Sequence, residues 1–352
     1  MRDLYTFRPS PVRWPMALQA ALSIAVPSVG FALVGHPALG LLASSGAFVA
    51  LYLGHRSRRW RARLLPLVAA GLLVASGAGI LSSSGAIASV IAIAAIAILA
   101  TALCLGLNVG PPGALFFVLV SGVSNHLAAP ASRGGAGIDG WLAFGLLALG
   151  CLIAYLIVLA PLVLPASRRR DSAVHVGQSA PRFGFDAVSR VILLRVSVAV
   201  VLASAIALPL GVQRGYWVVV TVVAILQNGP RLSLTAVRTV HRIVGTLIGI
   251  GLFAAITGFQ PSGVVLGLLL ATLQFIVELL IIRNYGLALA FITPLALTLA
   301  LHGTQRPITD EVGERVLDTL VGAAIALIVL LATLAVRVIG RDRWRRVDSG
   351  GS

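Results

Sequence analysis

Residues 87–107 read IASVIAIAAIAILATALCLGL, and residues 142–164 read LAFGLLALGCLIAYLIVLAPLVL. Neither stretch contains a charged side chain. An apolar run of about 18 residues or more can cross the hydrocarbon core of a bilayer as one helix, because an α-helix rises about 1.5 Å per residue. Both stretches therefore predict membrane-spanning helices, which places the chain among integral membrane proteins.

The composition of the whole chain favours the same class. Of 352 residues, 58% are hydrophobic and 11% are charged, whereas a soluble domain carries about 25% charged residues. The formal net charge is +16, but the arginines lie in short segments between apolar runs, where basic residues set membrane topology. The expected partner is therefore the lipid bilayer and not nucleic acid. Cys104 and Cys151 lie inside apolar runs and are predicted to be small buried side chains.

The apolar runs predict an all-α fold of about twelve transmembrane helices in two six-helix halves. We expect a first repeat over residues 1–164, a cytoplasmic linker over 165–189, a second repeat over 190–340 and a basic cytoplasmic tail over 341–352. The predicted spans of the first half are 14–34, 37–53, 64–82, 86–106, 108–127 and 141–164. Those of the second half are 190–210, 215–228, 238–258, 262–282, 285–302 and 311–337.

The distribution of arginines predicts the orientation. With the N-terminus inside, the cytoplasmic segments contain the cluster from Arg56 to Arg63, the linker and the arginines of the tail. Only Arg133, Arg214, Arg306 and Arg315 then lie on the outer side. Since basic residues concentrate in cytoplasmic loops, we expect a multi-pass protein of the cytoplasmic membrane with both termini inside.

Internal similarity predicts that the two halves are repeats. An apolar run begins at Gly40, ends at Gly54 and is followed by arginines, and the same arrangement recurs from Gly215 to Gly229. Each half has an even number of predicted spans, so both halves point the same way. We therefore expect parallel repeats related by a pseudo-two-fold axis along the membrane normal.

One predicted span is short and ends in polar residues. Residues 216–226 form an apolar run that as a helix is about 16 Å long, roughly half of the hydrocarbon core. Gln227, Asn228, Gly229 and Pro230 follow it. Short segments interrupted by glycine or proline at matching places in two repeats indicate a transport site. Gln227 and Asn228 are therefore predicted to contact the substrate.

Three arginines of the second half are candidates for binding an anion. Arg238 and Arg242 are four residues apart and share one face of a helix. Arg195 lies about five residues into the seventh predicted span, where a charge is costly and usually faces a partner or water. We predict that the three converge on one cytoplasm-facing vestibule. The alternative is that Arg238 and Arg242 only set topology and reach lipid phosphates.

Three further ionisable residues are candidates for coupling or for balancing charge. Glu278 lies near the end of the tenth predicted span, and Asp318 and Arg315 lie in the last one. Intramembrane carboxylates are functional candidates, so proton coupling is one hypothesis. The other is that Glu278 and Asp318 are counter-ions for Arg195 or Arg315.

Four stretches of the second half resemble a known family. They read GYWVVVTVVAILQNGP over 215–230, RTVHRIVGTLIG over 238–249, RNYGLALAFITP over 283–294 and RVLDTLVG over 315–322. In this order and spacing they resemble the fusaric acid resistance family, also called the aromatic acid exporter or FUSC family. The resemblance implies a membrane transporter that exports aromatic acids. Plant anion channels activated by aluminium also resemble this family, so the resemblance implies anion movement more firmly than pumping.

The leading hypothesis is a transporter that exports organic anions of the aromatic carboxylate type. The alternatives are a major-facilitator-type permease, an anion channel, and a membrane-embedded structural or assembly protein without transport activity. The sequence contains no nucleophile–base or metal-ligating pattern, so no catalytic residue, metal, cofactor or enzymatic activity is expected. The expected ligand is a small anionic molecule, and no particular oligomeric state is predicted.

Overall fold

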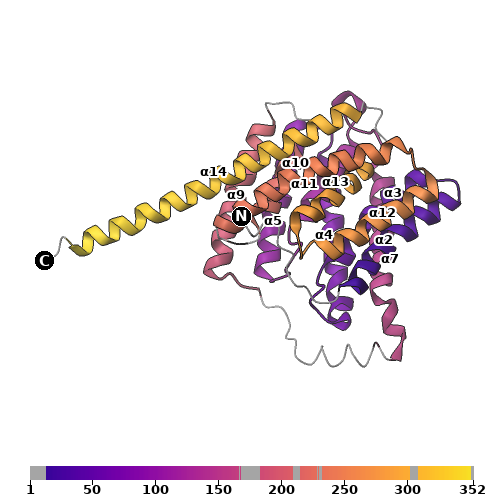
Figure 1. Ribbon diagram of the computed structural model, residues 1–352, viewed down its shortest axis with the longest axis horizontal. Helices are drawn as coiled ribbons and strands as arrows, with labels where there is room; N and C mark the ends of the chain where they lie inside the picture. The colour runs from indigo at the N-terminus through magenta and orange to yellow at the C-terminus, as the bar shows by residue number, and fades with distance from the viewer. Residues whose placement is uncertain are drawn as a thin grey trace.

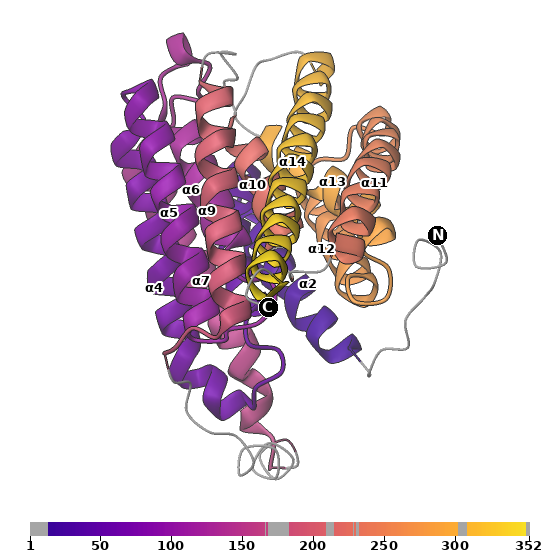
Figure 2. The ribbon, with the colours of Figure 1, turned by 90° about the vertical axis from the view of Figure 1, so that its left-hand side faces the viewer.

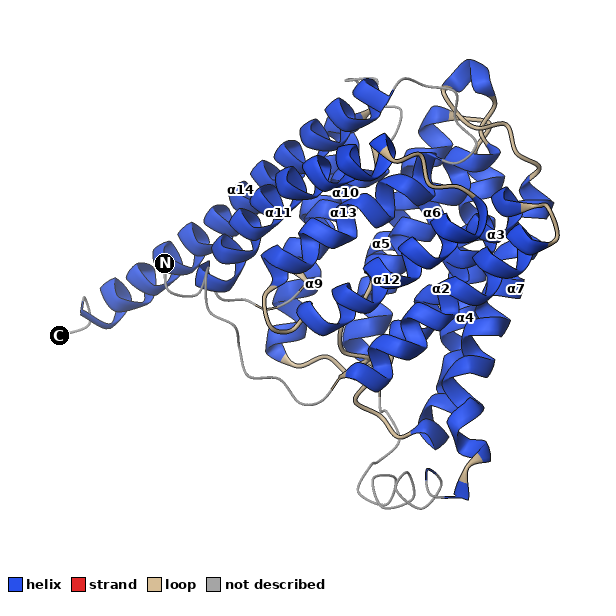
Figure 3. Cartoon of the chain, turned by 45° about the vertical axis from the view of Figure 1, so that its right-hand side comes forward, coloured by secondary structure: helices blue, strands red, loops and turns tan. Residues whose placement is uncertain are grey.

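The fold is a bundle of helices, seen in a computed structural model that describes residues 13–165, 167, 183–208, 215–227, 229, 232–301 and 308–349. Over these ranges the regular structure is helical, without strands (Figure 3). The all-α prediction is therefore confirmed. The predicted linker, 165–189, lies largely outside the described residues, as do Asn228 and the C-terminal end of the predicted tail.

The helices follow one another in two series, with one series on each side of the linker. The first series is α2 (Trp14–Leu33), α3 (Pro37–Ser44), the 3₁₀ helix η1 (Ser45–Leu51), α4 (Arg58–Ser82), α5 (Ala86–Gly106), α6 (Leu115–Ala128), the 3₁₀ helix η2 (Ala131–Arg133), α7 (Gly140–Leu159) and the 3₁₀ helix η3 (Ala160–Val163). The second is α9 (Ala187–Ala207), α10 (Tyr216–Leu226), α11 (Leu232–Gly258), α12 (Gly263–Leu280), α13 (Tyr285–Leu301) and α14 (Ile308–Ser349).

Eight of the described helices are long and apolar enough to cross a membrane. Large aliphatic side chains cover their outer surfaces; Leu81, for example, is 81% exposed and Leu152 is 52% exposed. Leucines that face outward on a continuous bundle suit lipid and not water. Together with the apolar composition, these helices make the chain a multi-pass membrane protein.

Four shorter apolar helices accompany the long ones. They are Pro37–Leu51, Leu115–Ala128, Tyr216–Leu226 and Tyr285–Leu299. The predicted break in the spans that start near Gly40 and Gly215 is confirmed: the first changes from α to 3₁₀ helix at Ser45, and the second has only eleven residues.

One of the short helices was predicted as a longer span. The predicted span 108–127 is wrong at its start, since helix α6 begins only at Leu115. Asn108, Gly110 and Gly113 have positive φ, and Pro111–Pro112 lies between them. Proline lacks a backbone donor and left-handed residues interrupt a helix, so these residues form turns instead.

The ends of several long helices also differ from the prediction. Helix α4 begins at Arg58 and not near residue 64, because the Ser57 hydroxyl caps it by accepting a hydrogen bond from the Trp60 amide. Helix α9 is capped in the same way by Asp186, whose carboxylate accepts from the Ser189 amide. Helix α14 continues to Ser349 and projects beyond the bundle (Figure 1).

Most packing pairs of helices in the first series have a counterpart in the second. In the first, α2 packs on α3 and α7, α4 on α6 and α7, α5 on α6, and η1 on α7; in the second, α9 packs on α10 and α14, α11 on α13 and α14, α12 on α13, and α10 on α14. Between the series, α2 packs on α12 and α5 packs on α9. Figure 2 shows α4, α5 and α6 on one side, α11, α12 and α13 on the other, and α10 and α14 between them.

Candidate substrate-binding cavity

A cavity of about 590 Å³ lies between the two series of helices. It is lined from the first series by residues of α2, α3, η1, α6 and α7, and from the second by residues of α10 to α14. All four short apolar helices contribute to its wall. The breaks in these helices therefore create space inside the bundle where backbone and side chains can meet a ligand.

One wall of the cavity is basic. Arg238 and Arg242, one turn apart on α11, both line it, and Arg315 of α14 lines it as well. The Arg242 guanidinium donates a hydrogen bond of 3.2 Å to the Thr221 hydroxyl and one of 3.4 Å to the Tyr285 hydroxyl. Arg242 is only 4% exposed. These contacts fix a permanently charged group where α10, α11 and α13 meet.

Aromatic rings hold the other two arginines of this wall. The guanidinium carbon of Arg315 lies 3.7 Å from the centroid of the Trp217 ring, and that of Arg238 lies 4.8 Å from the centroid of the Tyr285 ring. A cation is attracted to the face of an aromatic ring through the ring quadrupole. Such a contact orients an arginine without cancelling its charge, so this wall attracts anions.

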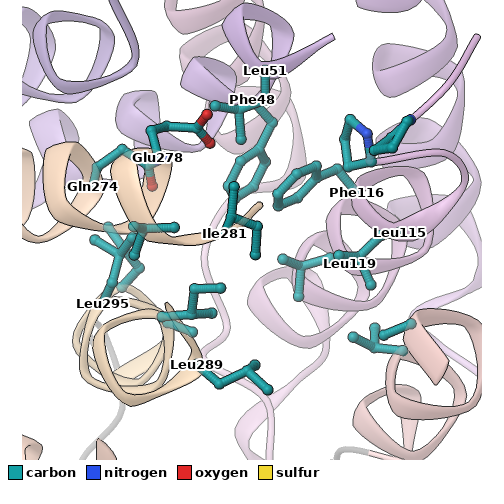
Figure 4. A pocket seen from close by; sticks show the side chains of 18 of the residues that line it. Phe48, Leu51, Leu115, Phe116, Leu119, Gln274, Glu278, Ile281, Leu289 and Leu295 are labelled. Atoms are coloured by element: carbon teal, nitrogen blue, oxygen red, sulfur yellow. The ribbon is translucent and has the colours of Figure 1, made fainter. Parts of the chain in front are cut away.

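Much of the remaining lining is apolar and partly aromatic. Phe48 of η1 and Phe116 of α6 stack with their ring centroids 4.2 Å apart and an interplanar angle of 16°. In Figure 4, Leu51, Leu115 and Leu119 lie on the side of these rings, Ile281 lies close to Phe48, and Leu289 and Leu295 of α13 lie across the pocket. A ligand in this cavity therefore meets both cations and hydrocarbon.

Glu278 is the one carboxylate among the described residues that line the cavity, alongside five arginines. Its Oε2 lies 3.8 Å from Nη2 of Arg13, just before α2. The predicted counter-ions for Glu278 were Arg195 or Arg315, whereas the ion pair that the structure forms is with Arg13. This pair joins the first series to the second at the extensive contact between α2 and α12.

Gln227 lines the cavity, but both ends of its amide are occupied. Its Oε1 accepts a hydrogen bond of 3.0 Å from the Ala114 amide, and its Nε2 donates one of 2.9 Å to the Pro112 carbonyl. The Tyr52 hydroxyl donates to the neighbouring Gly113 carbonyl at 2.8 Å. The turn before α6 is thus clamped from both series, and Gln227 positions it. Asn228, the other predicted contact, lies outside the described residues.

The structure groups the remaining predicted residues differently from the sequence hypothesis. Arg195 and Asp318 are buried in α9 and α14, and neither lines the cavity. Asp318 nevertheless interacts electrostatically with Arg315, as the counter-ion hypothesis expects. Arg315, predicted as a counter-ion or coupling group, takes the place expected for Arg195 beside Arg238 and Arg242. The arginines that converge are therefore those of α11 and α14.

Several lining residues were not predicted from the sequence. Arg13, Phe48, Phe116, Trp217 and Tyr285 were not among the candidates. Trp217 and Tyr285 belong to the stretches that carry the family resemblance, so aromatic residues near conspicuous arginines were a usable signal. Phe48 and Phe116 had no such signal, since aromatic residues in apolar runs usually fill a core.

The arrangement can hold an amphipathic anion by charge and by apolar contact. Over the described ranges, no group of three or more His, Cys, Asp and Glu side chains could hold a metal ion. The anionic part of a ligand would meet guanidinium groups, which bind carboxylates well because their donors match the carboxylate geometry.

Comparison with known proteins confirms the family resemblance. Residues 199–329 match the family described as fusaric acid resistance protein-like. The uncharacterized membrane protein YvaC of Bacillus subtilis (strain 168) is 35% identical over 151 residues, which are 42% of this chain and 24% of that protein. The uncharacterized protein YhfK of Escherichia coli (strain K12) is 34% identical over 137 residues, 38% of this chain and 18% of that protein.

The extent of these matches is limited. The chain spans about a quarter or less of the length of these curated relatives. No solved structure matches the chain. The matched region, 199–329, contains α10 and α11 entire and so includes Arg238, Arg242 and Trp217.

Proposed function

We propose that this chain, whose residues 199–329 match the fusaric acid resistance protein-like family, exports amphipathic organic anions across the cytoplasmic membrane, with aromatic carboxylates as the substrate class. The observation that carries the proposal is the central cavity, which is lined both by Arg238, Arg242 and Arg315 and by Phe48 and Phe116.

The arginines and the apolar side chains of the cavity select for different parts of the substrate. A unit charge about 4 Å from a guanidinium gains roughly 4 kcal/mol at an effective dielectric near 20, before its desolvation is subtracted. A benzene ring buries on the order of 100 Å², which at about 25 cal/mol per Å² contributes about 2.5 kcal/mol. Neutral aromatic molecules lack the first contribution and small inorganic anions lack the second, so both should be transported poorly.

We further infer that the chain is built as two parallel six-helix repeats, 1–164 and 190–340, joined by the linker 165–189. The support is that most packing pairs of the first series have a counterpart in the second when α2 is matched with α9, α3 with α10, and so on to α7 with α14, although α4–α5 and α6–α7 have none of comparable extent. Between the series, α2–α12 corresponds to α9–α5 in the same way, whereas the contact of α6 with α10 has no such counterpart. The short helices also fall at matching places, as expected for a transport site between repeats.

The proposed topology predicts the result of reporter fusions. We expect a periplasm-dependent phosphatase to be active when fused after Gly134, in the loop after α6, and inactive when fused in the linker or at the C-terminus. A fluorescent protein that folds only in the cytoplasm should give the reciprocal pattern. The physical reason is the excess of arginines in the segments assigned to the cytoplasm. An active phosphatase in the linker would contradict the six-plus-six arrangement.

The proposed function is tested by measuring substrate accumulation. Cells that lack the gene should accumulate severalfold more radiolabelled benzoate and salicylate than cells that express it, while accumulation of benzyl alcohol should be equal in both. Export against the electrochemical gradient separates a pump from an anion channel, which only equilibrates its ion with the membrane potential. Equal accumulation of every acid in both strains would favour a structural or assembly protein instead.

A further inference from the structure

A second cavity, of about 300 Å³, lies beside the start of helix α10. The central cavity includes Gln227, just after the end of α10, whereas the second cavity includes Gly215 and Tyr216 at its start. The rest of its wall comes from the start of α5, the end of α6 with the loop that follows, and the end of α9.

Helix α10 separates the two cavities, and each cavity meets a different face of it. Tyr216 and Val219, three residues apart, line the second cavity, whereas Trp217, Val220 and Ala224 line the central one. Residues three and four apart share a helical face. Every residue of α10 is buried, which agrees with a helix that has no lipid-facing side.

The barrier between the cavities is thin at one place. Tyr216 and Trp217 are neighbours in the chain, with ring centroids 5.2 Å apart and an interplanar angle of 31°. Tyr216 belongs to the second cavity, and Trp217 carries Arg315 on the central side. The two cavities thus approach each other from either side of one aromatic pair.

The lining of the second cavity is mixed, and it includes several polar side chains and one positive charge. Its polar side chains are Ser89, Asn125, His126, Arg133, Ser204 and Tyr216. Arg133 is held in place by donating a hydrogen bond of 2.7 Å to the Ser83 carbonyl. Asn125 donates to the hydroxyls of Ser82 and Ser89 and so fixes the end of α6 to the end of α4 and the start of α5. None of the described residues that line this cavity is a carboxylate.

We propose that the second cavity is an anion-binding site in which Arg133, with His126 beside it, receives the carboxylate that leaves the central cavity. The Tyr216–Trp217 pair is then the barrier that the substrate passes, with Arg315 on one side of it and Arg133 on the other. The direction of passage rests on the proposed export function; binding of an anion at Arg133 does not.

Cysteine labelling tests the site without a transport measurement. Val90→Cys places a thiol in the second cavity and Ser45→Cys places one in the central cavity. The native Cys104 and Cys151 are buried, and the unsubstituted chain gives the background. In sealed vesicles, we expect a membrane-impermeant sulfonate-bearing thiol reagent to label the two variants from opposite sides. This anionic reagent should also label the Val90→Cys variant faster than a trimethylammonium reagent does.

Arg133 should set this preference for the anionic reagent. Adding Arg133→Gln to the Val90→Cys variant should lower the ratio of anionic to cationic labelling rates by about tenfold, since a charge focused by low-dielectric walls raises local anion concentration at least that much. Arg133→Lys should retain the ratio, and Arg283→Gln, in the wall of the central cavity, should leave it unchanged. Benzoate added on the same side should slow the labelling unless Arg133 is replaced.

The outcomes separate this inference from the proposed function. An unchanged rate ratio in Arg133→Gln, or labelling of the Ser45→Cys and Val90→Cys variants from the same side, would overturn the second site even if benzoate is exported. Conversely, the ratio of anionic to cationic labelling rates could depend on Arg133 and on benzoate while expression of the chain changes no substrate accumulation. That result would retain the site and refute export. A double variant with Ser45→Cys and Arg133→Gln verifies that Arg133→Gln is folded. Its thiol in the central cavity should be labelled at the same rate as in Ser45→Cys alone.

Discussion

Arg242→Gln is expected to lower the transport rate of every anionic substrate by about 100-fold while leaving membrane insertion intact. The buried guanidinium of Arg242 is held by Thr221 and Tyr285 and faces the cavity beside Arg238 and Arg315. Loss of about 100-fold corresponds to about 2.7 kcal/mol, which is less than the roughly 4 kcal/mol that one charge contributes at about 4 Å. Since the charge attracts any carboxylate, the loss should be similar for all acids tested.

Two variants make this experiment interpretable. Arg242→Lys keeps a positive charge but cannot reproduce the forked contact with Thr221 and Tyr285, so its transport rate should lie between those of the unsubstituted chain and Arg242→Gln. In the proposed repeats Arg63 corresponds to Arg238, but Arg63 is exposed and does not line the cavity, so Arg63→Gln should transport normally. If Arg242→Gln is folded and transports at the unsubstituted rate, Arg242 only sets topology.

The long helices were predictable because their sequences carry continuous local signals. Residues 86–106 were predicted as a span and form α5, Ala86–Gly106, because one apolar run lies there between a glycine and a turn. The predicted span 141–164 corresponds to α7 and η3. Hydropathy is averaged over such runs, so it identifies the presence of a span reliably. It is insensitive to the turn at Pro111–Pro112, where apolar residues surround the break.

The composition of the cavity was predictable only in part. Arg238 and Arg242 lie on one helical face, and the spacing of four residues is a local signal. By contrast, Arg13 and Glu278 are far apart in the chain and meet only because α2 packs on α12. Phe48 and Phe116 likewise stack across two elements of the first series. Such pairs depend on the tertiary arrangement, which no spacing within one segment encodes.

The polar side chain of Gln227 shows that a residue at a helix break can have a second role. A polar residue at a helix break was interpreted as a substrate contact, yet its amide satisfies the backbone of the turn at Pro112 and Ala114. Buried turns need partners for their backbone donors and acceptors. In a bundle whose helices are interrupted, a polar side chain at the break can serve the exposed backbone as readily as a ligand. Sequence alone does not separate the two roles.

Gly150→Ala is expected to lower the thermal midpoint of the protein by about 10 °C. Helix α7 crosses the junction of α3 and η1 at Gly150 and Gly46, where a Cβ added to Gly150 would overlap the Ala43 carbonyl oxygen and lie 2.9 Å from the Ala43 carbonyl carbon. Both obstructing atoms are backbone, so no side-chain rotation relieves the overlap. Overpacking of a core costs up to about 3 kcal/mol when neighbours can shift, and a cost of that size corresponds to roughly 10 °C at about 2–4 °C per kcal/mol.

Gly145→Ala on the same helix is the matched control. A Cβ at Gly145 meets nothing within 4 Å, and alanine favours a helix over glycine, so the midpoint should stay the same or rise slightly. Detergent-solubilised variants can be compared by the fraction that remains monodisperse after heating. Equal midpoints for the two variants would mean that the α7–η1 crossing is not tight. If the crossing is tight, Gly150→Ala should also weaken benzoate binding at temperatures below the thermal midpoint. The reason is that the substitution displaces η1, which contributes Phe48 to the cavity wall.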